Sequence, residues 1–176
     1  MNDADPKGQS AEPEAAQTDS ADSPRFELIS IYTKDISFEA PSLPQILIQR
    51  PSENPANRAD FRVDHKVLNP DQGLTEVRLG VTVTCTLDTQ TLYLAEVEQC
   101  GLFIVRHGNA STIEKTVHVA CPNILLPFAR EQIAGLISKG NFPPFLIAPI
   151  NFEQAYLEKR KQQAEQGKDG GQDIQP

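Results

Sequence analysis

The stretch "EVRLGVTVTCTL", residues Glu76 to Leu87, decides how the rest of the chain is interpreted. From Val77 onward every second residue is apolar, and most residues between them are polar. Because neighbouring side chains of a strand point to opposite faces, this alternation is typical of an antiparallel strand with one buried face. The residues expected on that buried face are Val77, Leu79, Val81, Val83, Cys85 and Leu87.

Three more segments are predicted to be strands. Residues 26–38 are rich in β-branched and aromatic side chains, which favour strands. Residues 61–68 alternate cleanly between apolar and polar side chains, and "NPDQG" (69–73) after them is a turn. The tripeptide "DTQ" (88–90) turns the central strand into a fourth one, roughly 91–105.

Two helices are expected after the strands. Residues 121–140, "CPNILLPFAREQIAGLISKG", carry apolar side chains close to helical spacing, and Pro122 suits a first helical turn. Asn151 can cap a last helix through "FEQAYLEKRKQQ". Strands followed by helices predict an α+β fold, in which two helices pack on one face of a four-stranded antiparallel sheet.

The two ends of the chain differ from this central part. Residues 1–24 hold six acids against one lysine and no Val, Ile, Leu or aromatic residue, so we expect a disordered acidic tail. The folded domain is expected over residues 25–162. Residues 163–176 are rich in Gln, Gly and charge and are expected to form a flexible C-terminal tail.

Composition narrows the function. A formal net charge of -8 disfavours nucleic acid as a partner, because phosphates repel such a surface. There is no run of eighteen apolar residues and no signal-peptide pattern, so we expect a cytoplasmic protein without direct membrane insertion. The three cysteines are an odd number without paired spacing, which favours reduced thiols.

No pattern of catalytic or metal-binding residues is apparent. The chain lacks a Gly-x-Ser-x-Gly or His-Glu-x-x-His motif. His118 and Cys121 are three residues apart, but a metal site needs more ligands at compatible spacing. We therefore expect no catalytic residue, no metal and no cofactor, and not an enzyme.

Two carboxylates in "IYTKDISFEAP" (31–41) raise the main functional question. Asp35 and Glu39 are four residues apart and so share one face of the predicted strand. A catalytic pair would need a concave, partly desolvated site, which a flat sheet face does not offer. Two interpretations remain: ordinary solvent-facing charge on an edge strand, or a docking surface for a basic partner.

Several long motifs resemble the SecB family of bacterial protein-export chaperones. "IYTKDISFEAP" resembles the first-strand signature of that family, and "VTVTCTL" and "LAEVEQCGLF" resemble its third and fourth strands. "CPNILLPFARE" and "KGNFPPFLIAPINF" resemble its helix and crossover loop. The resemblance covers most of residues 26–160.

The resemblance implies an assembly and a delivery mechanism. SecB proteins are homotetramers, dimers of dimers, that hold unfolded precursor proteins without ATP and deliver them to the motor SecA. It places motor docking at Asp35, Glu39, Leu94 and Glu96. It places subunit packing at Ala95, Val97 and Gln99.

The family also holds its clients in apolar grooves. We expect such a groove near the end of the first strand and in the proline-rich loop, where prolines keep apolar residues extended. The residues expected in the client groove are Phe38, Leu43, Phe142, Phe145, Leu146 and Ile147.

Two alternatives remain open. One is a SecB-like chaperone of a toxin–antitoxin system, which the presence of the four docking positions argues against. The other is a small-molecule-binding or catalytic domain that uses His107, His118 and Cys121. A buried polar pocket around those three residues would favour it.

Overall fold

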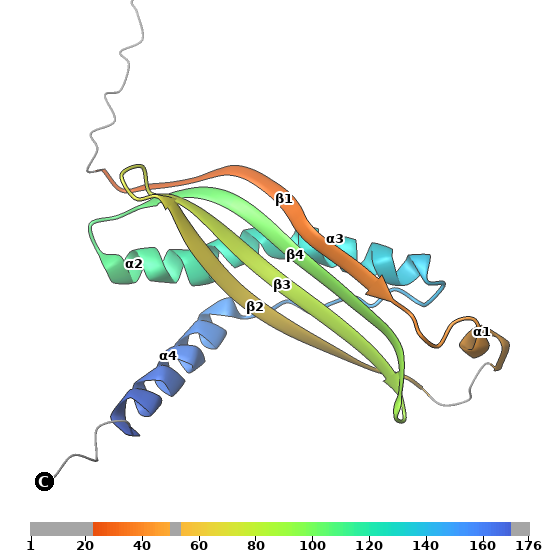
Figure 1. The fold of residues 1–176 in the computed structure, drawn as a ribbon. Helices are drawn as coiled ribbons and strands as arrows, with labels where there is room; N and C mark the ends of the chain where they lie inside the picture. The colour runs from red at the N-terminus through yellow and green to blue at the C-terminus, as the bar shows by residue number, and fades with distance from the viewer. Residues whose placement is uncertain (1–22, 50–53, 170–176) are drawn as a thin grey trace, which may run out of the picture.

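The computed structural model describes residues 23–49 and 54–169, with side chains up to residue 162. Four antiparallel strands form one sheet, as predicted, and the structure shows their order to be β1-β4-β3-β2 (Figure 1). The strands are β1 (Arg25–Glu39), β2 (Ala56–Asn69), β3 (Leu74–Leu87) and β4 (Gln90–Arg106). Each begins and ends within a few residues of its predicted bounds except β2, which begins five residues earlier.

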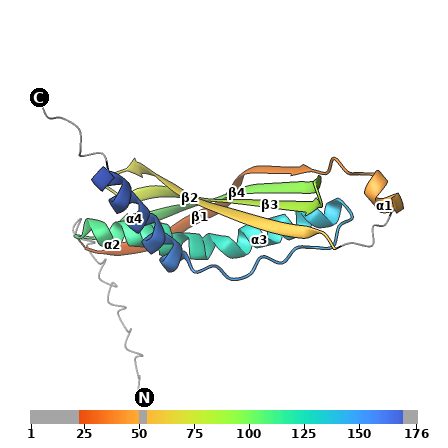
Figure 2. The same cartoon turned by 90° about the horizontal axis from the view of Figure 1, so that it is seen from below.

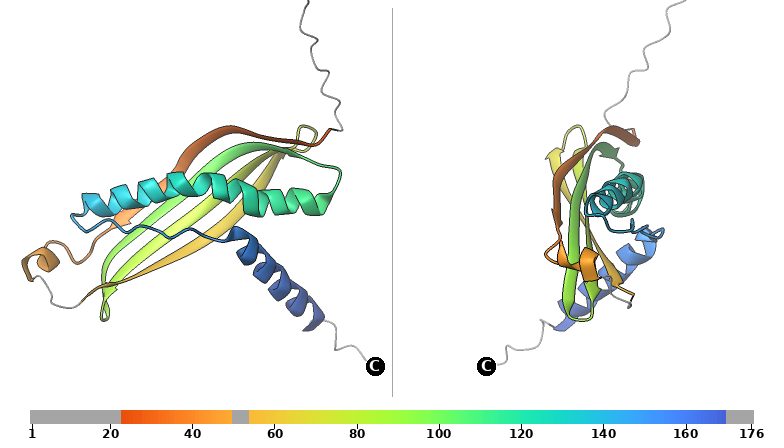
Figure 3. Two further views of the ribbon diagram at one scale, coloured as in Figure 1. Left: turned by 180° about the vertical axis from the view of Figure 1, so that it is seen from behind. Right: turned by 90° about the vertical axis from the view of Figure 1, so that its right-hand side faces the viewer.

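The long helical segments lie on one side of the sheet (Figures 2 and 3). A continuous helical segment crosses that side and consists of α2 (Ala110–Lys115), the π-helical turn η1 (Thr116–Ala120) and α3 (Cys121–Lys139). It is longer than predicted, because Asn109 caps a start eleven residues before Cys121: its side chain accepts a hydrogen bond from the Ser111 N–H. Pro127 lies inside α3, and the helix continues beyond it.

The face of the sheet against α3, called the inner face here, carries the core. Val77, Leu79, Val81, Val83 and Cys85 of β3 are all buried there, which confirms the predicted alternation. From α3 they meet the buried side chains of Leu125, Ile133 and Ile137. The other face, the outer face, is covered by no helix among residues 23–49 and 54–169 (Figure 3).

The last helix, α4 (Phe152–Asp169), contacts η1 and leans away from the sheet beside β2 (Figure 3). Asn151 caps it as predicted, since its side chain accepts a hydrogen bond from the Gln154 N–H at 3.0 Å. The helix is longer than "FEQAYLEKRKQQ" and passes the predicted domain boundary at Gln162. A further short helix, α1 (Gln45–Gln49), was not predicted.

A β-bulge in β1 decides which side chains reach the outer face. Thr33 pairs with Gln99 and Asp35 with Glu98, so Lys34 is an extra residue in the ladder. In a regular strand, Asp35 would share the inner face with Thr33. Because of the bulge, Asp35, Ser37 and Glu39 point to the outer face instead.

Candidate functional site

The predicted docking residues lie together on the outer face. In the β1–β4 ladder Asp35 pairs with Glu98, Ser37 with Glu96, and Glu39 with Leu94. Directly paired residues of an antiparallel sheet point to the same face. Asp35, Glu39, Leu94 and Glu96, named separately in the sequence, therefore form one surface on two adjacent strands.

The acids of this surface are open to solvent. Asp35 and Glu39 are exposed, and neither forms an ion pair within the described part of the chain. Glu96 is exposed and accepts hydrogen bonds from Ser37 Oγ at 3.4 Å and Thr82 Oγ1 at 3.2 Å. We call Asp35, Glu39 and Glu96 the docking acids. Hydroxyl donors thus hold Glu96 in place.

A fourth acid, Glu98, belongs to the same surface and was missed in the sequence. It pairs with Asp35 in the ladder, but it is only partly exposed. Two arginines approach it: Arg62 Nη2 lies 3.5 Å from Glu98 Oε2, and Arg78 Nη1 lies 4.0 Å from Oε1. Because these arginines come from β2 and β3, only the sheet register could have revealed them.

Glu76, also on the outer face, is different. Glu76 is only 7% exposed. Its carboxylate accepts a hydrogen bond from the Tyr32 hydroxyl, and Lys34 Nζ lies 3.0 and 3.1 Å from its two oxygens. The hydrogen bond from Tyr32 lowers the pKa of Glu76, and Lys34 and Arg78 add to this effect against the opposing effect of burial. Burial and the nearby Glu76 carboxylate in turn raise the pKa of Tyr32.

The residues expected in subunit packing lie on the inner face. Ala95, Val97 and Gln99 are all buried within the single chain. Gln99 donates a hydrogen bond to the backbone oxygen of Tyr32 at 2.9 Å and accepts one from Thr33 Oγ1 at 3.2 Å. The three side chains thus fix β4 to β1 and to the core under α3.

The residues expected in the client groove are only partly brought together. Phe38 and Phe142 flank Tyr93, with ring centroids 6.1 and 4.9 Å from it. Leu43 and Phe145 are half-buried. Leu146 is 80% exposed, whereas its neighbour Ile147 is buried and accepts a hydrogen bond at its carbonyl from Arg130. The structure therefore gives an aromatic cluster, Phe38–Tyr93–Phe142, and one fully exposed apolar side chain.

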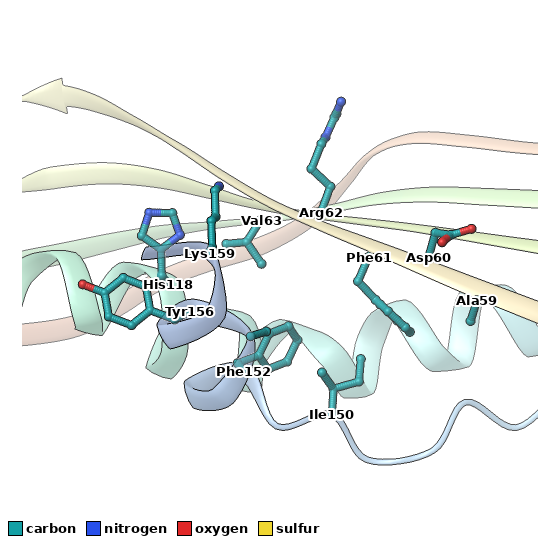
Figure 4. Close-up of a pocket in the computed structure, with 11 residues that line it drawn as sticks. Ala59, Asp60, Phe61, Arg62, Val63, His118, Ile150, Phe152, Tyr156 and Lys159 are labelled. Atoms are coloured by element: carbon teal, nitrogen blue, oxygen red, sulfur yellow. The ribbon is translucent and has the colours of Figure 1, made fainter. Parts of the chain in front are cut away.

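A cleft of about 550 Å³ lies elsewhere, between β2, η1 and α4 (Figure 4). Phe61 and Val63 line it from the inner side of β2, and Phe152 and Tyr156 line it from α4. It is mostly apolar, with Lys159 at its edge. The sequence pattern placed Phe61 on an apolar strand face but gave no indication that α4 would stand beside it.

Two residues that line this cleft, His118 and Tyr156, belong to a group of three rings. The His118 ring lies 5.2 Å from His65 and 5.8 Å from Tyr156, which it faces in parallel. Burial lowers the pKa of His118, and the nearby His65 and Lys159 lower it further, while Glu114 and Asp64 oppose them. The His118 ring therefore joins β2, η1 and α4.

The three residues of the catalytic alternative do not lie together. His107 is exposed, His118 lines the apolar cleft, and Cys121 is fully buried, so these three residues form no common polar pocket. All three cysteines are free and buried, and burial raises the pKa of Cys100 to about 11 and of Cys121 to about 12. Among the described residues no cluster of His, Cys, Asp and Glu could hold a metal ion. None of the described helices is long and apolar enough to cross a membrane.

Comparison with known proteins agrees with this geometry. Residues 19–163 match the protein family described as "Preprotein translocase subunit SecB". The chain belongs to the SecB family. As a SecB chaperone it is a holdase that acts in protein export, and it is not an enzyme.

Individual SecB relatives match along most of their length. The chain is 41% identical over 144 residues to the "Protein-export protein SecB" of Chromobacterium violaceum, covering 82% of this chain and 93% of that protein. It is 38% identical over 164 residues to the SecB of Xanthomonas campestris pv. campestris, covering 92% of each. A solved SecB-like chaperone of Mycobacterium tuberculosis, in complex with an antitoxin peptide, shares the fold at a TM-score of 0.60 and 15% identity, covering 72% of this chain and 91% of that one.

Proposed function

We propose that this chaperone binds unfolded precursor proteins in the bacterial cytoplasm without ATP and delivers them to the export motor SecA. The motor docks on the outer face, at Asp35, Glu39, Leu94 and Glu96. The observation that carries this proposal is the set of exposed docking acids on two adjacent strands of a helix-free face. Such charges attract a basic partner from a distance and raise the rate of encounter more than the affinity.

Clients bind to apolar surface on the side of the helices. The aromatic cluster around Tyr93, the exposed Leu146 and the cleft between β2 and α4 all offer such surface. Covering apolar area contributes roughly 25 cal/mol per Å², which must offset the ordering of the client segment. Each site is therefore weak, and one long client chain gains by engaging several of them at once.

Assembly into a homotetramer, a dimer of dimers, supplies these repeated sites. Apolar side chains of β1, the outermost strand on one side of the sheet, support association, because Phe26, Ile29 and Ile36 are exposed in the single chain. Ala95, Val97 and Gln99 act on this interface indirectly, since they are buried within the subunit and position β1 and α3. Sedimentation should give the mass of a tetramer at micromolar concentration, and a stable monomer would contradict the multivalent mechanism.

The chaperone activity is tested by aggregation of a denatured precursor protein. The purified protein should suppress light scattering at a stoichiometric ratio and without nucleotide. Dependence on ATP, or no suppression at a tenfold excess of the protein, would overturn the proposal. The docking acids favour delivery to the motor over service to a toxin–antitoxin pair, so binding of SecA is the second test.

A further inference from the structure

Arg62 crosses the sheet through a gap that Gly80 leaves open. In the ladders Arg62 of β2 pairs with Gly80 of β3, and Gly80 pairs with Glu98 of β4, so these three residues form one row. A Cβ atom added to Gly80 would lie 3.7 Å from Arg62 Cβ and 3.9 Å from Arg62 Nε. A Cβ alone would be in ordinary contact there, but a longer or branched side chain would extend into the space along which Arg62 lies, which we call the Gly80 gap.

The gap lets Arg62 reach an acid two strands away. Neighbouring strands lie about 4.8 Å apart, so β2 and β4 are separated by roughly 10 Å. Arg62 Nη2 nevertheless approaches Glu98 Oε2 to 3.5 Å, while its Nε stays 2.9 Å from Asp64 on its own strand. Figure 4 shows Arg62 pointing away from the cleft, on the side of β2 opposite to Phe61 and Val63.

Arg58 provides an internal comparison. It lies on the same strand and face as Arg62 and pairs with Asp60 at 2.8 Å, much as Arg62 pairs with Asp64. Its row across the sheet continues through Thr84 and Leu94 to Glu39. A threonine stands where the other row has glycine, and among the described residues Arg58 pairs with no acid of β4. Of these two arginines of β2, Arg62 alone reaches an acid of β4; Arg78 of β3 approaches the same Glu98 from a neighbouring row, at 4.0 Å.

We propose that Glu98 is a further docking residue, and that Arg62 occupies it until a basic partner displaces Arg62. This inference rests on the proposed docking of SecA to the outer face. The guanidinium at Glu98 shows that a cation fits there, beside Asp35. When the partner arrives, Arg62 keeps Asp64 as its counter-ion, so its displacement leaves no charge unpaired.

The expected effect is modest. Arg62 has a side chain that is 69% exposed, against 22% for Glu98, and such solvent-screened pairs contribute little each. Removing the competing arginine should therefore tighten docking of SecA by roughly two- to fivefold at low salt. The gain should shrink as salt rises, because both the internal pair and the docking contact are screened.

The experiment measures the affinity of purified SecA for the full-length protein by calorimetry. Arg62→Gln should tighten binding two- to fivefold, whereas the matched control Arg58→Gln, which removes the same charge from the same face, should change it less. Gly80→Thr should act like Arg62→Gln without changing the net charge, since a branched side chain fills the Gly80 gap. Adding Glu98→Gln to Arg62→Gln should abolish the gain.

The outcomes separate the two proposals. Equal gains for Arg62→Gln and Arg58→Gln would mean that only net charge matters, and would overturn the role of Glu98. An unchanged affinity of Arg62→Gln, with Asp35→Asn still weakening docking, would overturn this inference and leave the docking face intact. Failure of SecA to bind the unaltered protein would overturn both. Circular dichroism of each variant checks that the sheet is retained.

Discussion

Two sets of carboxylates on the outer face differ in nearly every physical property. Glu76 is 7% exposed and is held by Tyr32 and Lys34. Asp35 and Glu39 are exposed and have no cationic partner among the described residues. A buried, bonded carboxylate stabilises the fold and is unavailable to a partner, whereas an exposed one contributes little to stability and remains free to attract a cation.

The β-bulge at Lys34 separates the two sets. Because Lys34 is the extra residue, it can reach Glu76 on the same face on which Asp35 appears immediately after it. Lys34, the bulged residue, pairs with Glu76, whereas Asp35 and Glu39 after it form no ion pair among the described residues. The same strand therefore carries a structural ion pair and a docking surface side by side.

Glu76→Gln tests the structural half of this comparison and should have the largest effect. The substitution keeps the shape but removes the charge that Tyr32 and Lys34 contact, which should lower the free energy of unfolding by about 1–3 kcal/mol. Urea unfolding followed by circular dichroism measures it. Glu39→Gln is the control, with an expected change within about 0.5 kcal/mol. Equal losses in the two variants would remove the distinction between the two sets.

Asp35→Asn combined with Glu39→Gln tests the docking half. Loss of two exposed charges should weaken SecA binding by roughly tenfold at low salt, equivalent to about 1.4 kcal/mol, because each solvent-exposed pair contributes a fraction of that. Suppression of client aggregation should be unchanged, since clients bind apolar surface on the other side. Raising salt should weaken SecA binding more than client binding. Equal loss of both activities would contradict this division.

Much of the fold could be predicted from the sequence, because β3 alternates strictly and its neighbours carry turn residues at their ends. The shared face of Asp35 and Glu39 was also predictable from their spacing alone. That Leu94 and Glu96 lie on the same face as Asp35 and Glu39 was not predictable from spacing, because it depends on the ladder register and on the bulge at Lys34. Alternation within one strand says nothing about which residues of another strand lie opposite.

The features missed all depend on contacts between distant elements. Glu98 looks like any polar strand residue until the row through Gly80 to Arg62 is known. Phe61 and Tyr156 are 95 residues apart in sequence and meet only because α4 stands beside β2. Asn109 is a residue type that favours helix caps. The start of the long helix was nevertheless missed, because the polar residues of segment 110–120 obscure its helical pattern of apolar side chains.

Acid pH should weaken the internal network before it unfolds the sheet. Because the pKa of Glu76 is lowered in the folded protein, the unfolded chain binds a proton there more readily near the ordinary value of 4.5. Its contribution to stability is complete above that pH and is lost as pH falls through the lowered folded value. Urea midpoints between pH 6 and pH 3 should therefore fall less steeply for Glu76→Gln than for the unaltered protein. Parallel profiles would show that another group controls acid stability.

His118 should produce the smallest effect, in a higher pH window and at the cleft rather than at the outer face. Its pKa is lowered by burial, by His65 and by Lys159, against Glu114 and Asp64. The contribution of His118 to stability is therefore complete above its ordinary pKa of 6.5. It is lost as pH falls below that value toward the lowered folded pKa, because the unfolded chain takes up the proton first. His118→Phe keeps the ring between His65 and Tyr156 but cannot be protonated. The variant should lose less stability than the unaltered protein between pH 8 and pH 5.5, and an equal loss would show that the stacked ring does not hold α4 through its uncharged form.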